Sequence, residues 1–148
     1  KGTKSVDTIH KKLGNIMWDY VGMGRTKEGL EKALEELKKL RKEFDTDLFV
    51  PGTAGDGMNV ELDKAFRLKD FITMGELIAY DALNRNESCG GHFREEYQTE
   101  EGEAKRDDKN FFYVSCWNYQ GDDEKAPELI KEPLEYEAIK VQTRNYKS

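Results

Sequence analysis

The first stretch of the chain carries apolar residues at the spacing of one helix face. Ser5 stands where an N-cap is expected, and Gly22 and Gly24 stand where a helix would end. A helix from about residue 6 to residue 20 is therefore predicted. Its buried face would carry Val6, Ile9, Leu13, Ile16, Met17 and Tyr20.

A second helix is predicted to begin after Thr26, which can act as its N-cap. Glutamates and lysines separate its apolar positions and would form a face in contact with water. The break over residues 22–26 is short, so the two helices should form an antiparallel pair. The stripe of the second helix comprises Leu30, Leu34, Leu37 and Arg41, with Ala33, Leu40 and Phe44 beside it.

A loop is predicted for residues 45–59, which include one proline and three glycines, and a third helix for residues 61–84. The third helix is more apolar than the second, so we expect it to be the more buried. Three such helices indicate a mainly α fold, a three-helix antiparallel bundle of the spectrin-repeat type. The apolar positions of the third helix are Leu62, Ala65, Phe66, Leu68, Ile72, Leu77, Ala79, Ala82 and Leu83.

The second half of the chain changes character. Residues 87–97 are rich in turn formers, and residues 99–109 are hydrophilic. Residues 111–119 and 134–143 favour strands and predict a small antiparallel β element in an extended tail. The prediction divides the chain into a bundle with a glycine-rich turn, residues 1–98, and a polar insertion with a β-containing tail, residues 99–148, within one structural domain.

Composition narrows the class of protein. The 148 residues carry a net charge of −6, which argues against nucleic acid as a partner. No stretch approaches the roughly 20 apolar residues of a membrane span. The chain begins with Lys1 and not with methionine, so we expect it to have been cut from a longer protein. Two cysteines and the lack of an export signal favour a reducing, cytoplasmic setting.

The segment around Cys89 and His92 is the most unusual one for chemistry, and three interpretations remain open. It could be a Cys/His nucleophile pair, or part of a zinc site completed by His10 and Cys116. It could also be a glycine-rich turn after a helix, with the histidine hydrogen-bonded locally. The glycines elsewhere do not form a phosphate loop or a dinucleotide fingerprint. The residues alone therefore do not support a complete active site.

Three motifs resemble the C-terminal domain of the succinate dehydrogenase and fumarate reductase flavoproteins. The first runs from Leu13 to Tyr20 and continues with Gly24–Leu30, Gly-Arg-Thr-Lys-Glu-Gly-Leu. The second is Arg85–Tyr97, where the family pattern is Arg-Thr-Glu-Ser-Arg-Gly-Ala-His-x-Arg-x-Asp-x-Pro. The third begins with Arg106-Asp-Asp and leads into the aromatic strand. The order and spacing agree over nearly the whole chain.

The sequence also departs from this family pattern. Cys89 stands where the family has arginine, Gly91 where it has alanine, and Gln98 where it has proline. A hydrophilic insertion of about residues 99–105 follows. The loss of the family arginine puts in doubt any contact that this arginine would make to the rest of a flavoprotein.

The resemblance implies a role without catalysis in this chain. Family members bind FAD in an N-terminal part and interconvert succinate and fumarate by hydride transfer at the flavin. Electrons pass through an iron–sulfur subunit and, through membrane subunits, to or from quinone. The resemblance thus implies no catalytic, cofactor-binding or metal residue here, FAD in the parent protein, and a parent on the cytoplasmic face of the inner membrane.

The partner implied for this chain is the N-terminal flavin-binding core of the same protein. Candidate docking residues are Cys89, His92 and Arg94, of which Arg94 is favoured because guanidinium groups make forked contacts with carboxylates. A docking face should also expose apolar side chains. The candidates for that face are Trp18, Tyr20, Phe93 and Trp117. The alternative is a stand-alone helical module for protein interaction.

Overall fold

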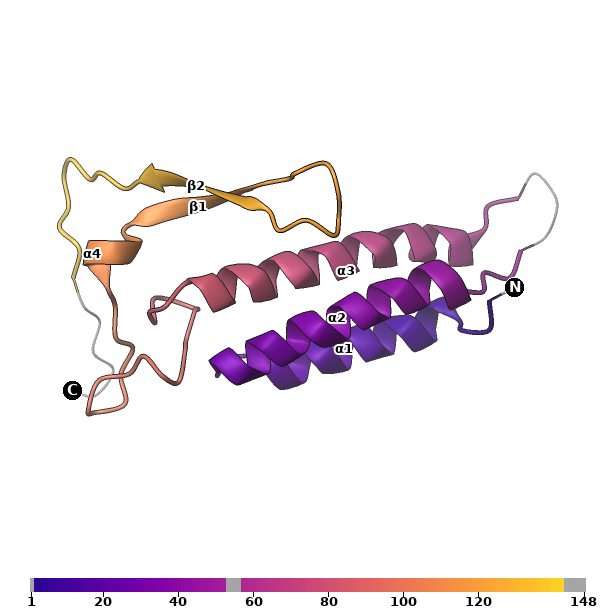
Figure 1. The fold of residues 1–148 in the computed structure, drawn as a ribbon, viewed down its shortest axis with the longest axis horizontal. Coiled ribbons are helices and arrows are strands. Elements are labelled where there is room, and N and C mark those ends of the chain that lie inside the picture. The colour runs from indigo at the N-terminus through magenta and orange to yellow at the C-terminus, as the bar shows by residue number, and fades with distance from the viewer. Residues whose placement is uncertain (1, 53–56, 143–148) are drawn as a thin grey trace.

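The computed structural model describes residues 2–52 and 57–142 and consists mainly of three long helices (Figure 1). They are α1 (Val6–Val21), α2 (Lys27–Asp47) and α3 (Val60–Asn84), packed side by side in alternating directions. The predicted antiparallel three-helix bundle is confirmed. The second helix extends to Asp47, slightly beyond the predicted start of the loop.

Side-chain caps fix where each long helix begins. The Ser5 hydroxyl accepts a hydrogen bond from the Thr8 amide at 3.2 Å, and the Thr26 hydroxyl accepts one from the Gly29 amide at 3.0 Å. Asn59 does the same for α3 through its side-chain oxygen. Each cap satisfies an amide that has no partner inside its helix. Both caps predicted from the sequence, Ser5 and Thr26, are confirmed.

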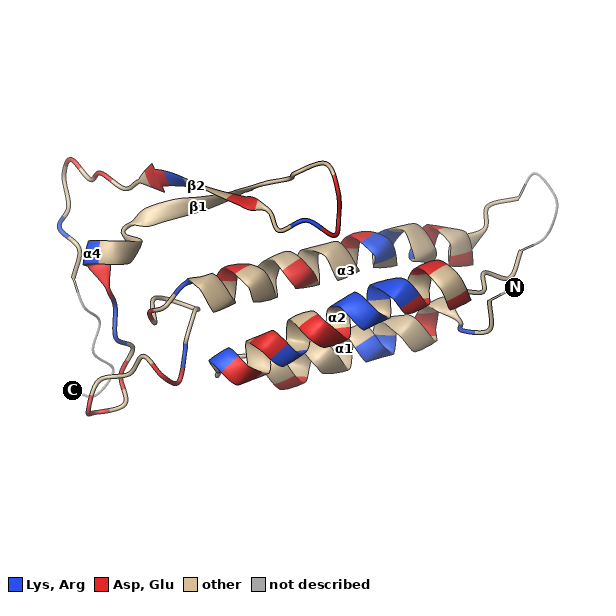
Figure 2. Ribbon diagram, in the orientation of Figure 1, with Lys and Arg blue, Asp and Glu red and all other residues tan. Residues whose placement is uncertain are grey.

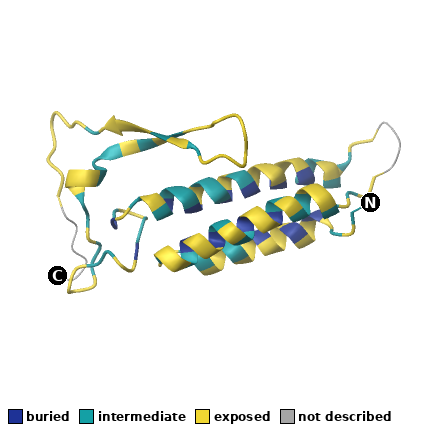
Figure 3. Ribbon diagram, in the orientation of Figure 1, coloured by how far each residue is buried: buried dark blue, intermediate teal, exposed yellow. Residues whose placement is uncertain are grey.

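The hydrophobic core lies along the axis of the bundle, between the inner faces of all three helices (Figure 3). The surplus apolar residues of α3 do not add to this core, and several of them are exposed. The expectation that its greater hydrophobicity makes α3 the more buried helix therefore holds only for its inner face. The fully buried core comprises Val6, Ile9, Leu13, Val21, Leu30, Ala33, Leu37, Leu40, Ala65, Leu68, Ile72, Ala79 and Ala82.

The second half adds a single helical turn and a hairpin. The turn α4 (Asp108–Phe111) leads into β1 (Tyr113–Asn118), which pairs antiparallel with β2 (Glu128–Pro133). The predicted first strand is confirmed in position, but the predicted second strand, residues 134–143, is wrong. Residues 134–142 form no strand, and Thr143 lies outside the described residues. The division of the chain after residue 98 stays a prediction.

Side chains attach the hairpin to the bundle. The indole Nε1 of Trp117 donates to the Asp81 carboxylate at 2.9 Å, and its ring meets Tyr80 edge-on at 5.0 Å. Arg85, at the end of α3, donates to the carbonyl oxygens of Phe111 and Tyr113. These contacts hold β1 over the outer side of α3, opposite the core (Figure 1).

Charged residues of both signs are interspersed over the helices (Figure 2). On α2 they form pairs three or four residues apart, such as Lys39 with Glu35 at 2.6 Å and Lys32 with Glu36 at 3.3 Å. Exposed pairs of this kind are screened by water and contribute little to stability. The face in contact with water that the sequence predicts for α2 is therefore present, and its main effect is solubility.

Candidate docking site

The glycine-rich turn closes through its own backbone. The amide of Cys89 donates to the carbonyl of His92 at 2.8 Å, and the amide of His92 donates back at 3.0 Å. Gly90 has a φ of +59°, a left-handed backbone conformation that residues other than glycine rarely adopt. Of the three interpretations of this segment, the turn is the one that these hydrogen bonds support.

This turn packs against the junction between α1 and α2. The amide of Arg25 donates to the Phe93 carbonyl at 3.1 Å, and the amide of Glu95 donates to the Arg25 carbonyl at 2.8 Å. The Glu96 carboxylate accepts from the Lys27 amide in the first turn of α2. Two segments distant in sequence thus meet at one end of the bundle: the α1–α2 junction and the turn that follows α3.

Both ring nitrogens of His92 are engaged, so the ring is not paired with the thiol of Cys89. The Nη1 of Arg25 lies 3.0 Å from Nδ1, and Nε2 lies 2.9 Å from the Arg85 carbonyl oxygen. Because a guanidinium can only donate, Nδ1 accepts and the ring proton sits on Nε2. Burial lowers the pKa of His92, and the charges of Arg25 and Arg94 lower it further, against the hydrogen bond to the Arg85 carbonyl.

Arg94 is buried and faces its own chain. Its Nη1 donates to the carbonyls of Ala82 and Leu83 at 3.0 and 3.2 Å, in the last turn of α3. Its Nε donates to the Glu96 carboxylate at 3.1 Å, and its backbone amide donates to the Ser88 hydroxyl at 2.8 Å. The side chain therefore caps α3 and fixes the turn from beneath. A part of Arg94 in docking stays a prediction.

Arg25 stands beside His92 and is half-buried. Its Nε donates to the carbonyls of Val21 and Gly22, at 3.2 and 3.0 Å, at the end of α1. Burial lowers the pKa of Arg25, and the more distant charge of Asp81 opposes this only in part. The motif that contains Arg25 predicts no role for it, although a position three residues after the helix-ending Gly22 is compatible with a capping side chain.

The residues considered for zinc do not come together. The ring of His10 packs against Phe71 on α3, at 5.7 Å, and Cys116 is exposed on β1. Within residues 2–52 and 57–142, no group of three or more His, Cys, Asp or Glu side chains could hold a metal ion. The zinc interpretation is therefore wrong for the described part of the chain.

The bundle exposes apolar side chains on α1 and α3. Trp18 is 84% exposed, whereas Tyr20, Phe93 and Trp117 are partly buried. A row on α3, here called the α3 stripe, consists of Phe71, Met74 and Ile78 and is also exposed. These three positions share a helix face beside α1, as the contact between His10 and Phe71 shows. An apolar face of this kind is typical of an interaction surface.

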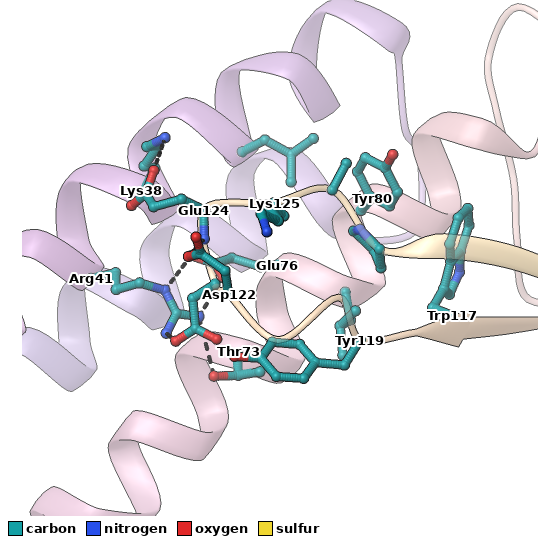
Figure 4. Close-up of a pocket in the computed structure, with 15 residues that line it drawn as sticks. Lys38, Arg41, Thr73, Glu76, Tyr80, Trp117, Tyr119, Asp122, Glu124 and Lys125 are labelled. Atoms are coloured by element: carbon teal, nitrogen blue, oxygen red, sulfur yellow. Dashed lines mark hydrogen bonds and ion pairs between the residues drawn. The ribbon is translucent and has the colours of Figure 1, made fainter.

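A cavity of about 530 Å³ separates the hairpin loop from α2 and α3 (Figure 4). Its apolar wall includes Leu77, Tyr80 and Trp117. At its polar end Arg41 donates to Glu76 and Thr73 from α3 and, at 3.4 Å, to Asp123 of the loop. The ionic groups at this end are paired with one another, so they fasten the loop to the bundle.

The sequence profile of the family described as fumarate reductase flavoprotein C-term matches residues 10–146. An uncharacterized FAD-dependent oxidoreductase of Methanocaldococcus jannaschii is 34% identical over 97 residues, which are 66% of this chain and 17% of that protein. The fumarate reductase flavoprotein subunit of a Serratia species is 30% identical over 143 residues, 95% of this chain and 21% of that protein.

A solved structure described as quinol-fumarate reductase with menaquinol molecules has the same fold. Its TM-score is 0.77 at 24% identity, over 95% of this chain and 23% of that chain. The bundle, the turn and the hairpin together thus define a C-terminal helical domain of the flavoprotein type. The chain belongs to the fumarate reductase flavoprotein C-terminal family. It spans about a fifth of the length of the relatives it matches.

Within the part that the structure describes, no helix is long and apolar enough to cross a membrane.

Proposed function

We propose that this chain is the C-terminal supporting domain of a flavoprotein that interconverts succinate and fumarate by hydride transfer to or from FAD. The observation that carries the proposal is the family match over residues 10–146. It is supported by the alignment over 95% of this chain with a fumarate reductase flavoprotein subunit. The chain by itself would be inactive.

FAD would be held by the part of the protein that lies outside this chain. Dinucleotides bind at parallel βαβ units, where the pyrophosphate meets a helix N-terminus. The sheet of the described residues is a two-stranded antiparallel hairpin. The residues present therefore do not fit the cofactor, and no catalytic step is assigned to them.

The partners of the parent protein would be an iron–sulfur subunit and, through it, membrane subunits that react with quinone. The parent would then lie at the cytoplasmic face of the inner membrane without spanning it. The shared fold with a quinol-fumarate reductase supports this placement. Nucleic acid is not among the proposed partners, because the chain carries a net charge of −6.

Two neighbouring surfaces would dock against the flavin-binding core. One is the turn with Cys89, His92 and Arg94, where Arg94 supports the surface from beneath. The other is the α3 stripe together with Trp18, which would bury apolar area on contact. Burial of such area stabilises an interface by about 25 cal/mol per Å².

The test is to purify the longest natural product that carries this chain and to measure its flavin content, its oxidation of succinate and its reduction of fumarate. A flavin absorbance near one equivalent with either activity supports the proposal. A protein free of flavin that performs neither reaction contradicts it.

The second candidate is a stand-alone interaction module. It is favoured by the complete core that the helices form without any other chain. An open reading frame that continues upstream through a glycine-rich flavin fingerprint would exclude this candidate. A reading frame that starts immediately before the bundle would favour it.

A further inference from the structure

We propose that Arg25 is a docking residue whose guanidinium binds a carboxylate side chain, Asp or Glu, of the flavin-binding part of the same protein. This inference rests on the proposed function and names the chemistry of one contact in it. The sequence interpretation placed docking at Cys89, His92 and Arg94. The geometry adds Arg25, which lies beside His92, to these candidates.

Arg25 differs from every other arginine that the structure describes. Each of the others has a carboxylate oxygen within the 4.0 Å that defines an ion pair, and Arg25 has none. Removing a cation from water without a paired anion costs free energy. The five pairs are Arg41–Glu76, Arg67–Asp63, Arg85–Glu87, Arg94–Glu96 and Arg106–Asp108.

A comparison with Arg41 shows what is missing. Both arginines are partly buried to a similar degree. The hydrogen-bonded carboxylate of Glu76 raises the pKa of Arg41, whereas burial lowers the pKa of Arg25. Asp81 opposes this lowering only through its charge, without an ion pair to Arg25, and its Oδ1 accepts from the indole of Trp117.

The guanidinium of Arg25 is held in place with one nitrogen unused. Nε donates to the end of α1, and Nη1 donates to the neutral ring of His92. Nη2 makes no hydrogen bond with any described group, while both of its protons can donate. A fixed cation with free donors is suited to a carboxylate, which accepts from adjacent guanidinium nitrogens.

The surroundings of Arg25 favour a protein partner. Met23, two residues earlier, is 91% exposed, and Gly90 and Gly91 of the adjoining turn are exposed. Protein–protein interfaces commonly combine an apolar contact with a charged residue that anchors it, and Met23 beside Arg25 offers this combination. This chain matches only about a fifth of the length of its relatives. The partner segment of Arg25 would belong to the remaining four-fifths.

The test uses the flavoprotein as two pieces, this chain and the remainder with its FAD, and measures their dissociation constant. Arg25→Gln removes the charge, and Arg25→Lys keeps the charge but loses the fork. Both should weaken binding about tenfold or more, as the loss of one partner of a buried charge pair does. Arg67→Gln removes an exposed arginine paired with Asp63 and should leave binding unchanged.

The possible results distinguish failure of the Arg25 inference from failure of the proposed function. If both Arg25 variants bind the remainder as tightly as the wild type, the inference is overturned and the proposed function survives. If the wild-type chain does not bind a remainder that carries FAD, or if no such remainder exists, the proposed function itself fails. If an Arg25 variant loses its helical circular dichroism, the structure of the intact wild-type protein decides. A carboxylate within 4 Å of Arg25 supports the inference, and its absence overturns it.

Discussion

Arg94 ends α3 by binding the carbonyl groups that the last helical turn leaves without partners. The residue is 1% exposed, and its guanidinium reaches Ala82, Leu83 and Glu96. A cation at a helix C-terminus also interacts favourably with the negative end of the helix dipole. One side chain thus couples the helix end to the turn that passes beneath it.

Arg94→Met should lower the free energy of unfolding by about 3 kcal/mol, because the carbonyls of Ala82 and Leu83 lose their charged donor and Glu96 loses its ion-pair partner. Urea unfolding followed by circular dichroism measures the change. Arg67→Met is the matched control and should shift the free energy by less than about 0.5 kcal/mol. Equal effects of the two changes would contradict the role given to Arg94.

His92 should make stability depend on pH. Its pKa is lowered in the folded chain, so the unfolded chain binds more protons between the folded value and about 6.5. The stabilisation is complete above pH of about 6.5 and declines as the pH falls through the folded pKa. His92→Asn keeps an acceptor for Arg25 without titrating, so this part of the decline should disappear. This loss is measured by the free energy of unfolding at several pH values between about 5 and about 7.5, the range in which histidine titrates. His10→Asn is the control and should retain the decline.

Some residue-scale features followed from the sequence and others did not. The N-caps Ser5 and Thr26 were predictable because capping acts on amides three residues away. The capping of α3 by Arg94 acts over eleven and twelve positions. It could not be predicted, because it depends on how the turn folds back.

Two glycines show how position in the bundle decides the effect of a side chain. A Cβ at Gly75 would lie 3.1 Å from the Met17 sulfur and 3.5 Å from Leu13 Cδ1, where α3 packs against α1. A Cβ at Gly14 would meet nothing within 4 Å. The first glycine permits close helix packing, and the second only adds backbone freedom.

Gly14→Ala should therefore raise the free energy of unfolding by about 0.5–1 kcal/mol. Gly75→Val should lower it by about 2 kcal/mol through overpacking. Thermal unfolding of the two variants measures both effects. A stabilised Gly75→Val variant would mean that α3 does not approach α1 as described.

The attachment of the hairpin depends on Trp117. Trp117→Phe removes the 2.9 Å hydrogen bond to Asp81 but keeps an aromatic ring beside Tyr80. The amide protons of β1 should exchange about tenfold faster, corresponding to about 1.4 kcal/mol, while those of α1 and α2 do not change. Trp18→Phe changes an exposed indole and should leave exchange in β1 unaffected. Unchanged exchange in the Trp117 variant would contradict this attachment.

The helices were predictable as elements because each carries a helical period and a cap. The second strand was misplaced for a physical reason. Residues 134–143 alternate between apolar and polar side chains, as a strand does, but a strand also needs a partner. The loop of residues 119–127 instead brings residues 128–133 beside β1, and these residues form the second strand. Pro133 lacks an amide proton and lies at the end of that segment.

At the scale of the whole molecule, α3 serves several surfaces. Its inner face completes the core, another side contacts the hairpin through Tyr80 and Asp81, and the α3 stripe is exposed. This explains a helix that is apolar on more than one side. It also explains how a chain of low mean hydropathy, −0.88, can still present an apolar interaction face.

The α3 stripe should promote self-association of the separate chain. Replacing Phe71 and Ile78 by Gln should lower association at high concentration, because exposed apolar area drives it. The free energy of unfolding should change by less than about 1 kcal/mol, since both side chains are largely outside the core. Analytical ultracentrifugation measures the association, with Val114→Gln on the hairpin as control. Unchanged association of the double variant would show that the α3 stripe does not mediate self-association.

We propose that this bundle supports the FAD-bearing part of a succinate/fumarate oxidoreductase. The most direct measurement is the structure and flavin content of the natural protein that carries this chain, purified through a C-terminal tag. We expect one bound FAD in a domain packed against the α3 stripe and the Arg25 junction, with oxidation of succinate or reduction of fumarate. A protein without flavin, or a flavin domain that leaves both surfaces open to solvent, would contradict it.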